Sequence, residues 1–198
     1  MSYFKKLIGQ RCYLSPCSSE DAAKWAEWDN DLEVTIPLGD EAYLPMPLEK
    51  EQELIGDSIR KQAHLFDVIA LEGDVLIGRC LLFDIDHINR AAMLGIAIGV
   101  KTYWGKGYGQ EAIRLLLDYG FNLLNLNSVM LGTFSFNERA IHCYRQVGFK
   151  EIGRRRQARI IAGKKYDAVL MDILAEEFES VYVAGWVEPE TSQREEAA

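Results

Sequence analysis

The feature that most restricts the fold of this chain is a run with three glycines in six residues, Trp104-Gly105-Lys106-Gly107-Tyr108-Gly109. It follows an apolar, strand-like segment and precedes a segment with helical spacing of apolar residues. Glycine reaches positive φ and lets a ligand approach the backbone, and the unbonded N–H groups of a first helical turn favour an anion. The pattern therefore predicts a phosphate-binding loop in a mixed α/β fold, to which Lys106 adds a positive charge.

Several ligands could use such a loop. The G-x-x-x-x-G-K-[ST] pattern of a P-loop nucleotidase is absent, which excludes that class. Residues 107–112 do satisfy the dinucleotide fingerprint G-x-G-x-x-A. However, residues 129–136 contain no carboxylate for the ribose, and the segments before the loop look like antiparallel hairpins. A dinucleotide site therefore fits poorly, whereas a purely structural turn or a coenzyme A site stays open.

Composition narrows the class of protein. The 198 residues carry a formal charge of -8, which argues against a nucleic-acid partner and would attract a cationic acceptor such as a polyamine or a basic protein terminus. Residues 154–156 form the one basic run, which we expect on an exposed strand edge or loop. The four cysteines show no C-x-x-C spacing, the histidines form no metal-binding cluster, and no segment is apolar enough to span a membrane. We expect a cytoplasmic protein with reduced thiols and no metal.

The periodicity predicts a mixed, mostly antiparallel central sheet of about six or seven strands flanked by helices. The strands are expected at residues 11–15, 66–71, 75–84, 91–100, 128–135, 150–160 and 165–173. Helices are expected from residue 18, at 47–62 with Leu48, Leu54 and Ile59 buried, at 108–124, at 137–147 and at 173–186. We expect one domain over residues 1–186 and a flexible tail over 187–198, with the last helix covering the core or meeting a second copy in a homodimer.

A second motif lies downstream of the loop. Asn137-Glu138-Arg139-Ala140 is followed by Tyr144-Arg145-Gln146-Val147-Gly148-Phe149. Asn137 is a good helix cap, and Ala140 and Tyr144 fall on its face of the helix. The N-x-x-A-x-x-x-Y-x-x-x-G-F spacing resembles the GNAT superfamily of N-acyltransferases, above all its ribosomal-protein and spermidine N-acetyltransferase branch. The glycine run matches the Q/R-x-x-G-x-G/A loop of that family except at Trp104.

The resemblance covers about residues 8–174 and implies a GNAT-like fold with acetyl-CoA as cosubstrate. It implies that a loop and the first helical turn bind the diphosphate of the coenzyme. It also implies that a strand and a groove bind the pantetheine arm, and that Tyr144 is the proton donor. The implied coenzyme-binding residues are Ala97, Ile98, Gly99, Trp104, Gly105, Lys106, Gly107, Tyr108, Gly109, Gln110, Asn137 and Ala140. The implied reaction is direct attack by a primary amine on the thioester.

The resemblance leaves the base and the acceptor open. Relatives often carry a glutamate two residues before the first strand glycine, where this chain has Met93, and Asp84 and Glu33 are the nearest candidates to replace it. His142 and Cys143 point about 100° apart on a helix and cannot act as a dyad. The acceptor, a small amine or a protein N-terminus, would bind at residues 31–47. Binding of acyl-CoA without turnover, as a sensor, is the alternative function.

Overall fold

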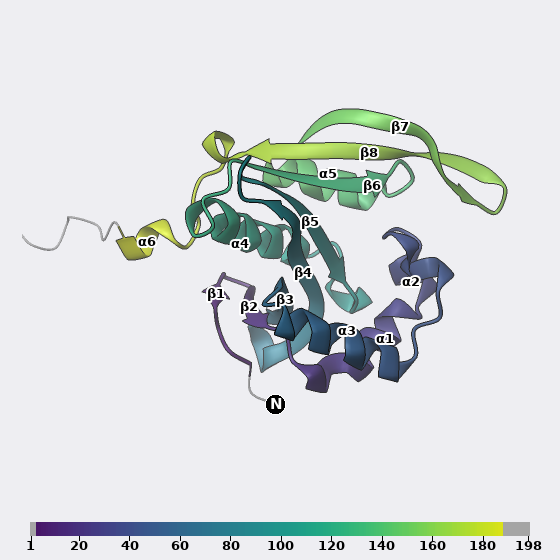
Figure 1. Ribbon diagram of the computed structural model, residues 1–198, viewed down its shortest axis with the longest axis horizontal. Coiled ribbons are helices and arrows are strands. Elements are labelled where there is room, and N and C mark those ends of the chain that lie inside the picture. The colour runs from purple at the N-terminus through teal and green to yellow at the C-terminus, as the bar shows by residue number, and fades with distance from the viewer. Residues whose placement is uncertain (1–2, 188–198) are drawn as a thin grey trace, which may run out of the picture.

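The chain is built around an eight-stranded sheet with the strand order β1-β2-β3-β4-β5-β6-β8-β7 (Figure 1). The computed structural model describes residues 3–187, so the predicted tail beyond Val187 lies outside the described residues. The strands are β1 (Leu7–Ile8), β2 (Cys12–Pro16), β3 (His64–Ala70), β4 (Val75–Asp86), β5 (Ala91–Ile98), β6 (Ser128–Phe134), β7 (Lys150–Ile161) and β8 (Lys164–Leu174). The seven predicted strands are confirmed, and the two-residue β1 is the eighth.

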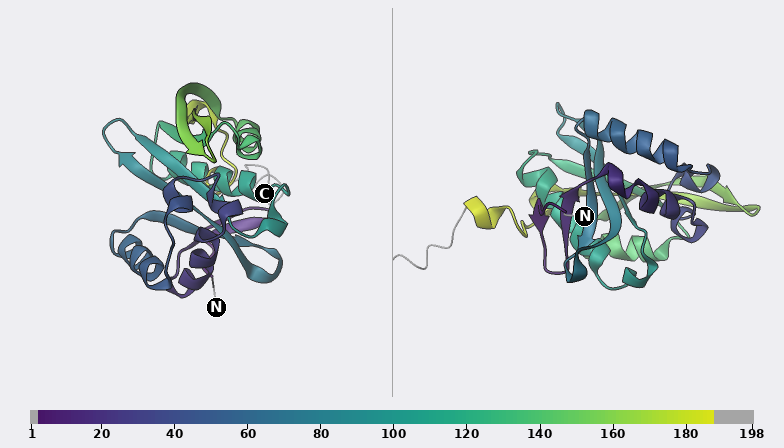
Figure 2. Two further views of the ribbon diagram at one scale, coloured as in Figure 1. Left: turned by 90° about the vertical axis from the view of Figure 1, so that its right-hand side faces the viewer. Right: turned by 90° about the horizontal axis from the view of Figure 1, so that it is seen from below.

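Helices cover both faces of this sheet (Figures 1 and 2). The α-helices are α1 (Ala22–Asp29), α2 (Leu32–Thr35), α3 (Leu48–Arg60), α4 (Tyr108–Asn122), α5 (Glu138–Val147) and α6 (Ala184–Val187). Short 3-10 turns lie at η1 (Ser19–Asp21), η2 (Asp40–Tyr43), η3 (Glu72–Asp74), η4 (Lys101–Tyr103) and η5 (Ala175–Glu177). Alternation along β2 separates two cores: Cys12 and Leu14 pack in the cluster of α4, whereas Tyr13 packs with Trp25 and Trp28 of α1.

Within residues 3–187, β5 and β6 are the one parallel pair of neighbouring strands. They pair over fewer residues than either strand does with its other neighbour. Only Ala91–Met93 of β5 pair with Ser128–Met130 of β6. Beyond these three pairs β5 continues along β4 and β6 continues along β8, so the two strands separate, as Figure 1 shows. The predicted mostly antiparallel sheet is confirmed, and it is split at its centre.

The predicted buried face of α3 is wrong. Leu48, Leu54 and Ile59 are 41%, 41% and 48% exposed, whereas Glu51 and Ile55 are buried at 1%. Glu51 faces inward because its carboxylate pairs with Arg79 of β4 at 3.1 Å. A charged residue therefore occupies the inner face that an apolar pattern would assign to leucine.

Arg79 is held by more than Glu51. Both carboxylate oxygens of Asp29 lie 2.8 Å from its Nη2, and its guanidinium lies 4.7 Å from the ring centre of Trp25. This half-buried cation is thus compensated by two carboxylates and an aromatic face, which lowers the cost of withdrawing its charge from water.

The predicted helix over residues 173–186 is also wrong. β8 runs on to Leu174, and after η5 the chain is irregular until α6. The carboxylate of Asp118, fully buried in α4, accepts hydrogen bonds from the backbone N–H groups of Val181, Tyr182 and Val183 at 3.0, 2.6 and 3.0 Å. These N–H groups are therefore not available to helical hydrogen bonds, and the segment is folded onto α4 instead.

Asp118→Ala should destabilise the fold by about 3 kcal/mol, because it leaves several donors without an acceptor. Asp118→Asn, which keeps one accepting oxygen, should lose less. Urea unfolding measures both. Glu179→Ala removes an exposed carboxylate from the same segment and should stay close to wild type; equal losses for Glu179→Ala and Asp118→Ala would contradict the assigned role.

The buried Asp67 of β3 should make stability depend on pH. Burial raises the pKa of this carboxyl from its ordinary 3.8 to about 8, and the nearby Asp21 adds to the rise. Between about pH 4 and pH 8 the folded protein then keeps a proton that the unfolded chain gives up. The free energy of unfolding should therefore fall as the pH rises through this window, and Asp67→Asn should remove this part of the fall.

Denaturant titrations at several pH values, taken as the difference between wild type and Asp67→Asn, isolate this contribution. Its size should be of the order of a few kcal/mol, since one pKa unit corresponds to about 1.4 kcal/mol. Asp84→Asn changes an exposed carboxylate and serves as the control. A difference that does not change with pH would show that Asp67 has an ordinary pKa.

Candidate active site

The glycine loop joins η4 to α4 and has the backbone that its sequence predicts. Gly105 and Gly107 adopt φ values of 70° and 85°, where side chains other than glycine are strained. A Cβ atom built on Gly105 would have no neighbour within 4 Å, so this side of the loop faces open space. The N–H groups at the start of α4, from Tyr108 to Gln110, have no acceptor within the helix. The loop therefore offers an accessible anion site, and Lys106 beside it is exposed.

Arg11 belongs to this site, although nothing in the sequence indicates it. The carboxylate of Glu111, in the first turn of α4, accepts hydrogen bonds from the N–H groups of Gln10, Arg11 and Cys12, each at 2.8 Å. This anchors the turn between β1 and β2 on the helix. The Arg11 side chain then passes Gly107, with its Nε 3.5 Å from where a Cβ atom on this glycine would lie. A second cation is thus brought to the loop from far away in the chain.

The free edge of β5 carries part of the predicted pantetheine site. The N–H group of Gly99 bonds to the carbonyl of Ile77 at 2.9 Å, so this N–H group faces β4. Because backbone groups alternate along a strand, Ala97 also faces β4, whereas Ile98 faces the open side. A Cβ atom on Gly99 would lie 2.0 Å from the Trp28 ring. The close approach that this glycine allows is therefore to a side chain.

Trp104, the residue that departs from the family pattern, covers the end of β5. Its indole Nε1 donates to the carbonyl of Ile98 at 2.6 Å, and the guanidinium of Arg139 lies 3.7 Å from the centre of its ring. Burial lowers the pKa of Arg139, while the nearby Glu33 opposes that change. The tryptophan thus joins the glycine loop, β5 and α5 at one point.

Asn137, Ala140 and Tyr144 lie on α5 as the motif predicts. The side chain of Asn137 caps the helix by accepting from the Ala140 N–H at 3.2 Å, and its Nδ2 lies 3.4 Å from the carbonyl of Pro37. Tyr144 is half-buried. Burial, with a smaller contribution from Cys143, raises the pKa of the Tyr144 phenol above its ordinary value, so the phenol keeps its proton at neutral pH.

The two candidate bases lie in different surroundings. Glu33 pairs with Lys101 at 2.5 Å. It is also close enough to Arg139 to raise the pKa of that guanidinium. Asp84 is exposed and has a φ of 49° at the irregular end of the pairing between β4 and β5. Met93 is opposite Phe83 and Met130, and the acid at its level of the sheet, Asp172 of β8, lies beyond Met130. Of the two acids, only Glu33 has a contact that ties it to the predicted site.

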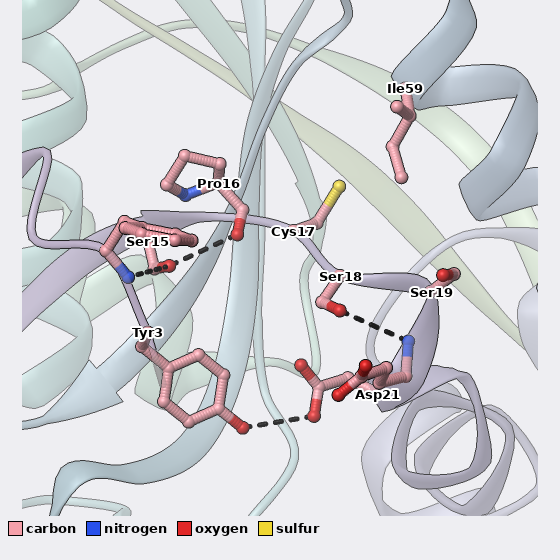
Figure 3. Close-up of a pocket in the computed structure, with 10 residues that line it drawn as sticks. Tyr3, Ser15, Pro16, Cys17, Ser18, Ser19, Asp21 and Ile59 are labelled. Carbon is pink, nitrogen blue, oxygen red and sulfur yellow. Dashed lines mark hydrogen bonds between the residues drawn. The ribbon is translucent and has the colours of Figure 1, made fainter. Parts of the chain in front are cut away.

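A separate cavity of about 420 Å³ opens between the end of β2, η1 and the end of α3 (Figure 3). Here the Tyr3 hydroxyl donates to Asp21 at 3.0 Å, and Ser18 caps η1 through its side-chain oxygen. The lining contains none of the residues predicted to bind a coenzyme, so this cavity is distinct from the site around the glycine loop.

Residues 3–187 lack two further features. Over this range no group of three or more His, Cys, Asp or Glu side chains is arranged to hold a metal ion. Within the same range no helix has the length and apolar character needed to cross a bilayer.

Comparison with known proteins identifies the family. Residues 11–150 match the model of the acetyltransferase (GNAT) domain. An uncharacterized N-acetyltransferase, p20, of Bacillus licheniformis is 30% identical over 174 residues, covering 87% of this chain and 97% of the relative. The spermidine N(1)-acetyltransferase of Escherichia coli K12 is 31% identical over 165 residues, covering 83% and 87%.

A solved structure agrees with the sequence comparisons. The spermidine N-acetyltransferase from Vibrio cholerae, in complex with CoA and spermine, superposes with a TM-score of 0.77 at 28% identity, covering 85% of this chain and 98% of that one. The predicted fold class is thereby confirmed, and with it the resemblance that rested on the two motifs. The chain belongs to the GNAT family of acetyltransferases, which use acetyl-CoA as the acetyl donor.

Proposed function

We propose that the chain transfers the acetyl group of acetyl-CoA to a primary amine, with its glycine loop binding the diphosphate and Tyr144 donating the proton. The observation that carries this proposal is the meeting of three features at one place. The open loop with two positive-φ glycines and the separation of β5 from β6 adjoin the free edge of β5. Trp104, bonded to Ile98 and stacked on Arg139, links this edge to α5, which carries the protonated phenol.

The residues of the loop fit the diphosphate of coenzyme A. The N–H groups from Tyr108 to Gln110 point along the axis of α4, whose dipole favours negative charge. Lys106 lies within the loop and Arg11 passes Gly107, so both bring positive charge to it. This arrangement would anchor the coenzyme by its charged end and leave its thioester end free to enter the sheet.

The gap between β5 and β6 suits the pantetheine arm. Backbone groups of Ile98 on β5 face this gap, and peptide-like ligands commonly add to such a free strand edge. In this chain the Ile98 carbonyl already accepts from Trp104. The arm would therefore either pair further along β5 or displace the indole. Asn137 and Ala140 of α5 complete the groove.

The chemical step is direct transfer. The neutral amine nitrogen attacks the thioester carbonyl carbon, a C–N bond forms and the C–S bond breaks. The amine loses one proton to solvent or a base, the departing sulfur takes one from the Tyr144 hydroxyl, and the phenolate then regains a proton from solvent. A well-placed acid of this kind contributes about 10² to 10⁴ in rate.

One observation favours a second candidate function, the binding of acyl-CoA without turnover. Met93 occupies the position where the resemblance led us to expect a glutamate base, and β5 supplies no other acid there. Release of free thiol from acetyl-CoA in the presence of primary amines separates the two functions, because a pure sensor binds the coenzyme and releases none.

The acceptor is a primary amine on a small molecule or a protein N-terminus. Relatives named for spermidine point to a small amine. The α2–η2 region, which we propose as the acceptor wall, carries the acids Asp31, Glu33, Asp40 and Glu41. The four cysteines are unpaired and two of them are buried, which suits a reducing compartment such as the cytoplasm.

Gly107→Ala tests the loop. A residue with a Cβ at a φ of 85° costs about 1 to 2 kcal/mol of strain, so the dissociation constant for acetyl-CoA should rise about tenfold. Calorimetry measures this. Gly153→Ala adds the same methyl group where no atom lies within 4 Å, and it should bind like wild type. Equal binding by all three proteins would remove the loop from the coenzyme site.

Tyr144→Phe tests the acid. Its kcat should fall about 10²-fold or more, whereas the dissociation constant for acetyl-CoA should change little. Tyr119→Phe is the matched control, because this half-buried phenol also has a raised pKa but bonds to His64 away from the loop. In wild type, kcat/KM should increase with pH as the amine loses its proton, and no decline from Tyr144 should occur below about pH 10. An unchanged kcat in Tyr144→Phe would exclude the phenol as proton donor.

A further inference from the structure

β7 is a basic edge strand in which one residue differs from all the others. Arg154, Arg155 and Arg156 are exposed, as the sequence predicts. Arg159, three residues further on, is the one buried residue of the strand, and its side chain is only 4% exposed. A buried arginine on an otherwise solvated strand needs a physical reason.

The side chain turns inward because of a bulge. The pairing of β7 with β8 shifts between Arg155, opposite Ala168, and Arg159, opposite Tyr166. Within the bulge Gln157 has a φ of 52°, and its N–H group donates to the side chain of Asp167 at 2.9 Å. Bulges re-aim side chains in this way, often next to functional sites.

The guanidinium of Arg159 lies between two aromatic rings. Its carbon is 4.4 Å from the ring centre of Tyr43 on η2 and 4.7 Å from that of Phe134 on β6. The nearest carboxylate, that of Asp40, is 3.7 Å from Nη1 and is itself 92% exposed. Across the described part of the chain, Nε and Nη2 of Arg159 are buried and have no hydrogen-bond acceptor.

A half-buried arginine, 18% exposed, shows what is missing. Arg79 also lies against an aromatic ring, but its guanidinium makes short contacts with both Asp29 and Glu51. Arg159 has the aromatic faces without the close carboxylates. Burying a guanidinium with unpaired donors costs folding free energy. The surroundings of Arg159 are therefore those of an anion-binding site.

Arg159 lies against η2, which belongs to the proposed acceptor wall. Phe134 ends the part of β6 that has separated from β5, and the next residues lead to the cap Asn137, whose Nδ2 faces Pro37. The residues after α2 therefore close over Arg159 and over the start of α5 together. Phe136, stacked on Phe134 with ring centres 5.8 Å apart, extends the same aromatic wall.

We infer that Arg159 binds a carboxylate of the acceptor, so that the amine acetylated by this enzyme is a small amino carboxylate rather than a polyamine. The inference rests on the proposed function and specifies its substrate. Arginine binds a carboxylate through two parallel N–H bonds, and Tyr43 and Phe134 would hold the guanidinium plane in place. A polyamine would instead bring a second ammonium group toward the buried Arg159 guanidinium, a repulsion that the exposed Asp40, 3.7 Å from Nη1, offsets only in part.

Access requires η2 to move. Tyr43, which covers the guanidinium, is 55% exposed and belongs to a four-residue surface turn. Displacing it disturbs no buried core residue of η2, because none of its residues is buried. The carboxylate would then replace the loose contact with Asp40.

Matched acceptors test the assignment. Thiol release from acetyl-CoA is measured with ω-amino carboxylates from glycine to 6-aminohexanoate, and with the alkylamine and the diamine of each chain length. L-Amino acids are compared with their amides in the same way. Within each set the nucleophile is a primary amine, rates are compared at equal concentrations of the neutral amine, and the far end is a carboxylate, a neutral group or an ammonium. Wild type should give its highest kcat/KM with an amino carboxylate.

Variants then locate the effect. Arg159→Gln should lower kcat/KM for that amino carboxylate about 10- to 100-fold and change the value for the matched neutral amine about twofold at most. Arg159→Lys should keep part of the preference, since it keeps the charge and loses the fork. Arg156→Gln, which removes an exposed arginine from the same strand, should keep all of it. Circular dichroism melts and the Kd for acetyl-CoA establish that each variant is folded.

The outcomes are separable. A preference for diamines in wild type, or an unchanged preference in folded Arg159→Gln, would overturn the carboxylate assignment and leave the proposed function in place. If Arg159→Gln does not fold, the wild-type preference together with Arg159→Lys decides. Binding of acetyl-CoA without thiol release for any amine would overturn the proposed function, and the assignment with it.

Discussion

The separation of β5 from β6 is the constraint on which the rest of the site depends. In a continuous sheet the backbone groups of these two strands would bond to each other, and no edge would be left for a ligand. Here three residue pairs hold the strands together at one end, and each strand is then kept in place by its other neighbour, β4 or β8. The gap is stable because its two sides belong to separate antiparallel ladders.

α4 is the element that fixes the loop relative to this gap. Glu111 near its start and Asp118 further along each collect three backbone N–H groups from opposite ends of the chain. A carboxylate that accepts several N–H bonds makes a strong, directional junction. The N-terminus of the helix is therefore held against the β1–β2 turn, and the amides that would bind the diphosphate are oriented before any ligand arrives.

Local patterns made most of the fold predictable, and long-range polar contacts account for what was missed. The hairpins, α4, β6 and α5 have turn residues, caps and periodicities that act over a few positions, so they could be read from the sequence. The inward Glu51 depends on a cation on a strand distant in sequence, and the missing last helix depends on Asp118. In the site, the glycine loop could be predicted because its pattern lies within six consecutive residues. The position of Arg11 beside Gly107 and the burial of Arg159 could not, because they result from a turn and a bulge whose effects only the folded chain reveals.

The charges around the proposed acceptor wall bear on the missing base. An amine must lose its proton before it can attack, and a nearby glutamate would take that proton in a relative that has one. Positive charges near a bound ammonium group achieve part of the same result, because they disfavour its charged form and lower its pKa. Arg159 and Arg139 supply such charges, whereas Lys101 is ion-paired with both Asp31 and Glu33. A carboxylate on the acceptor would neutralise Arg159, so the effect on the amine would then come mainly from Arg139. On this view Met93 is compatible with catalysis. The surrounding positive charges lower the pKa of the amine, so the amine can lose its proton without a glutamate at this position.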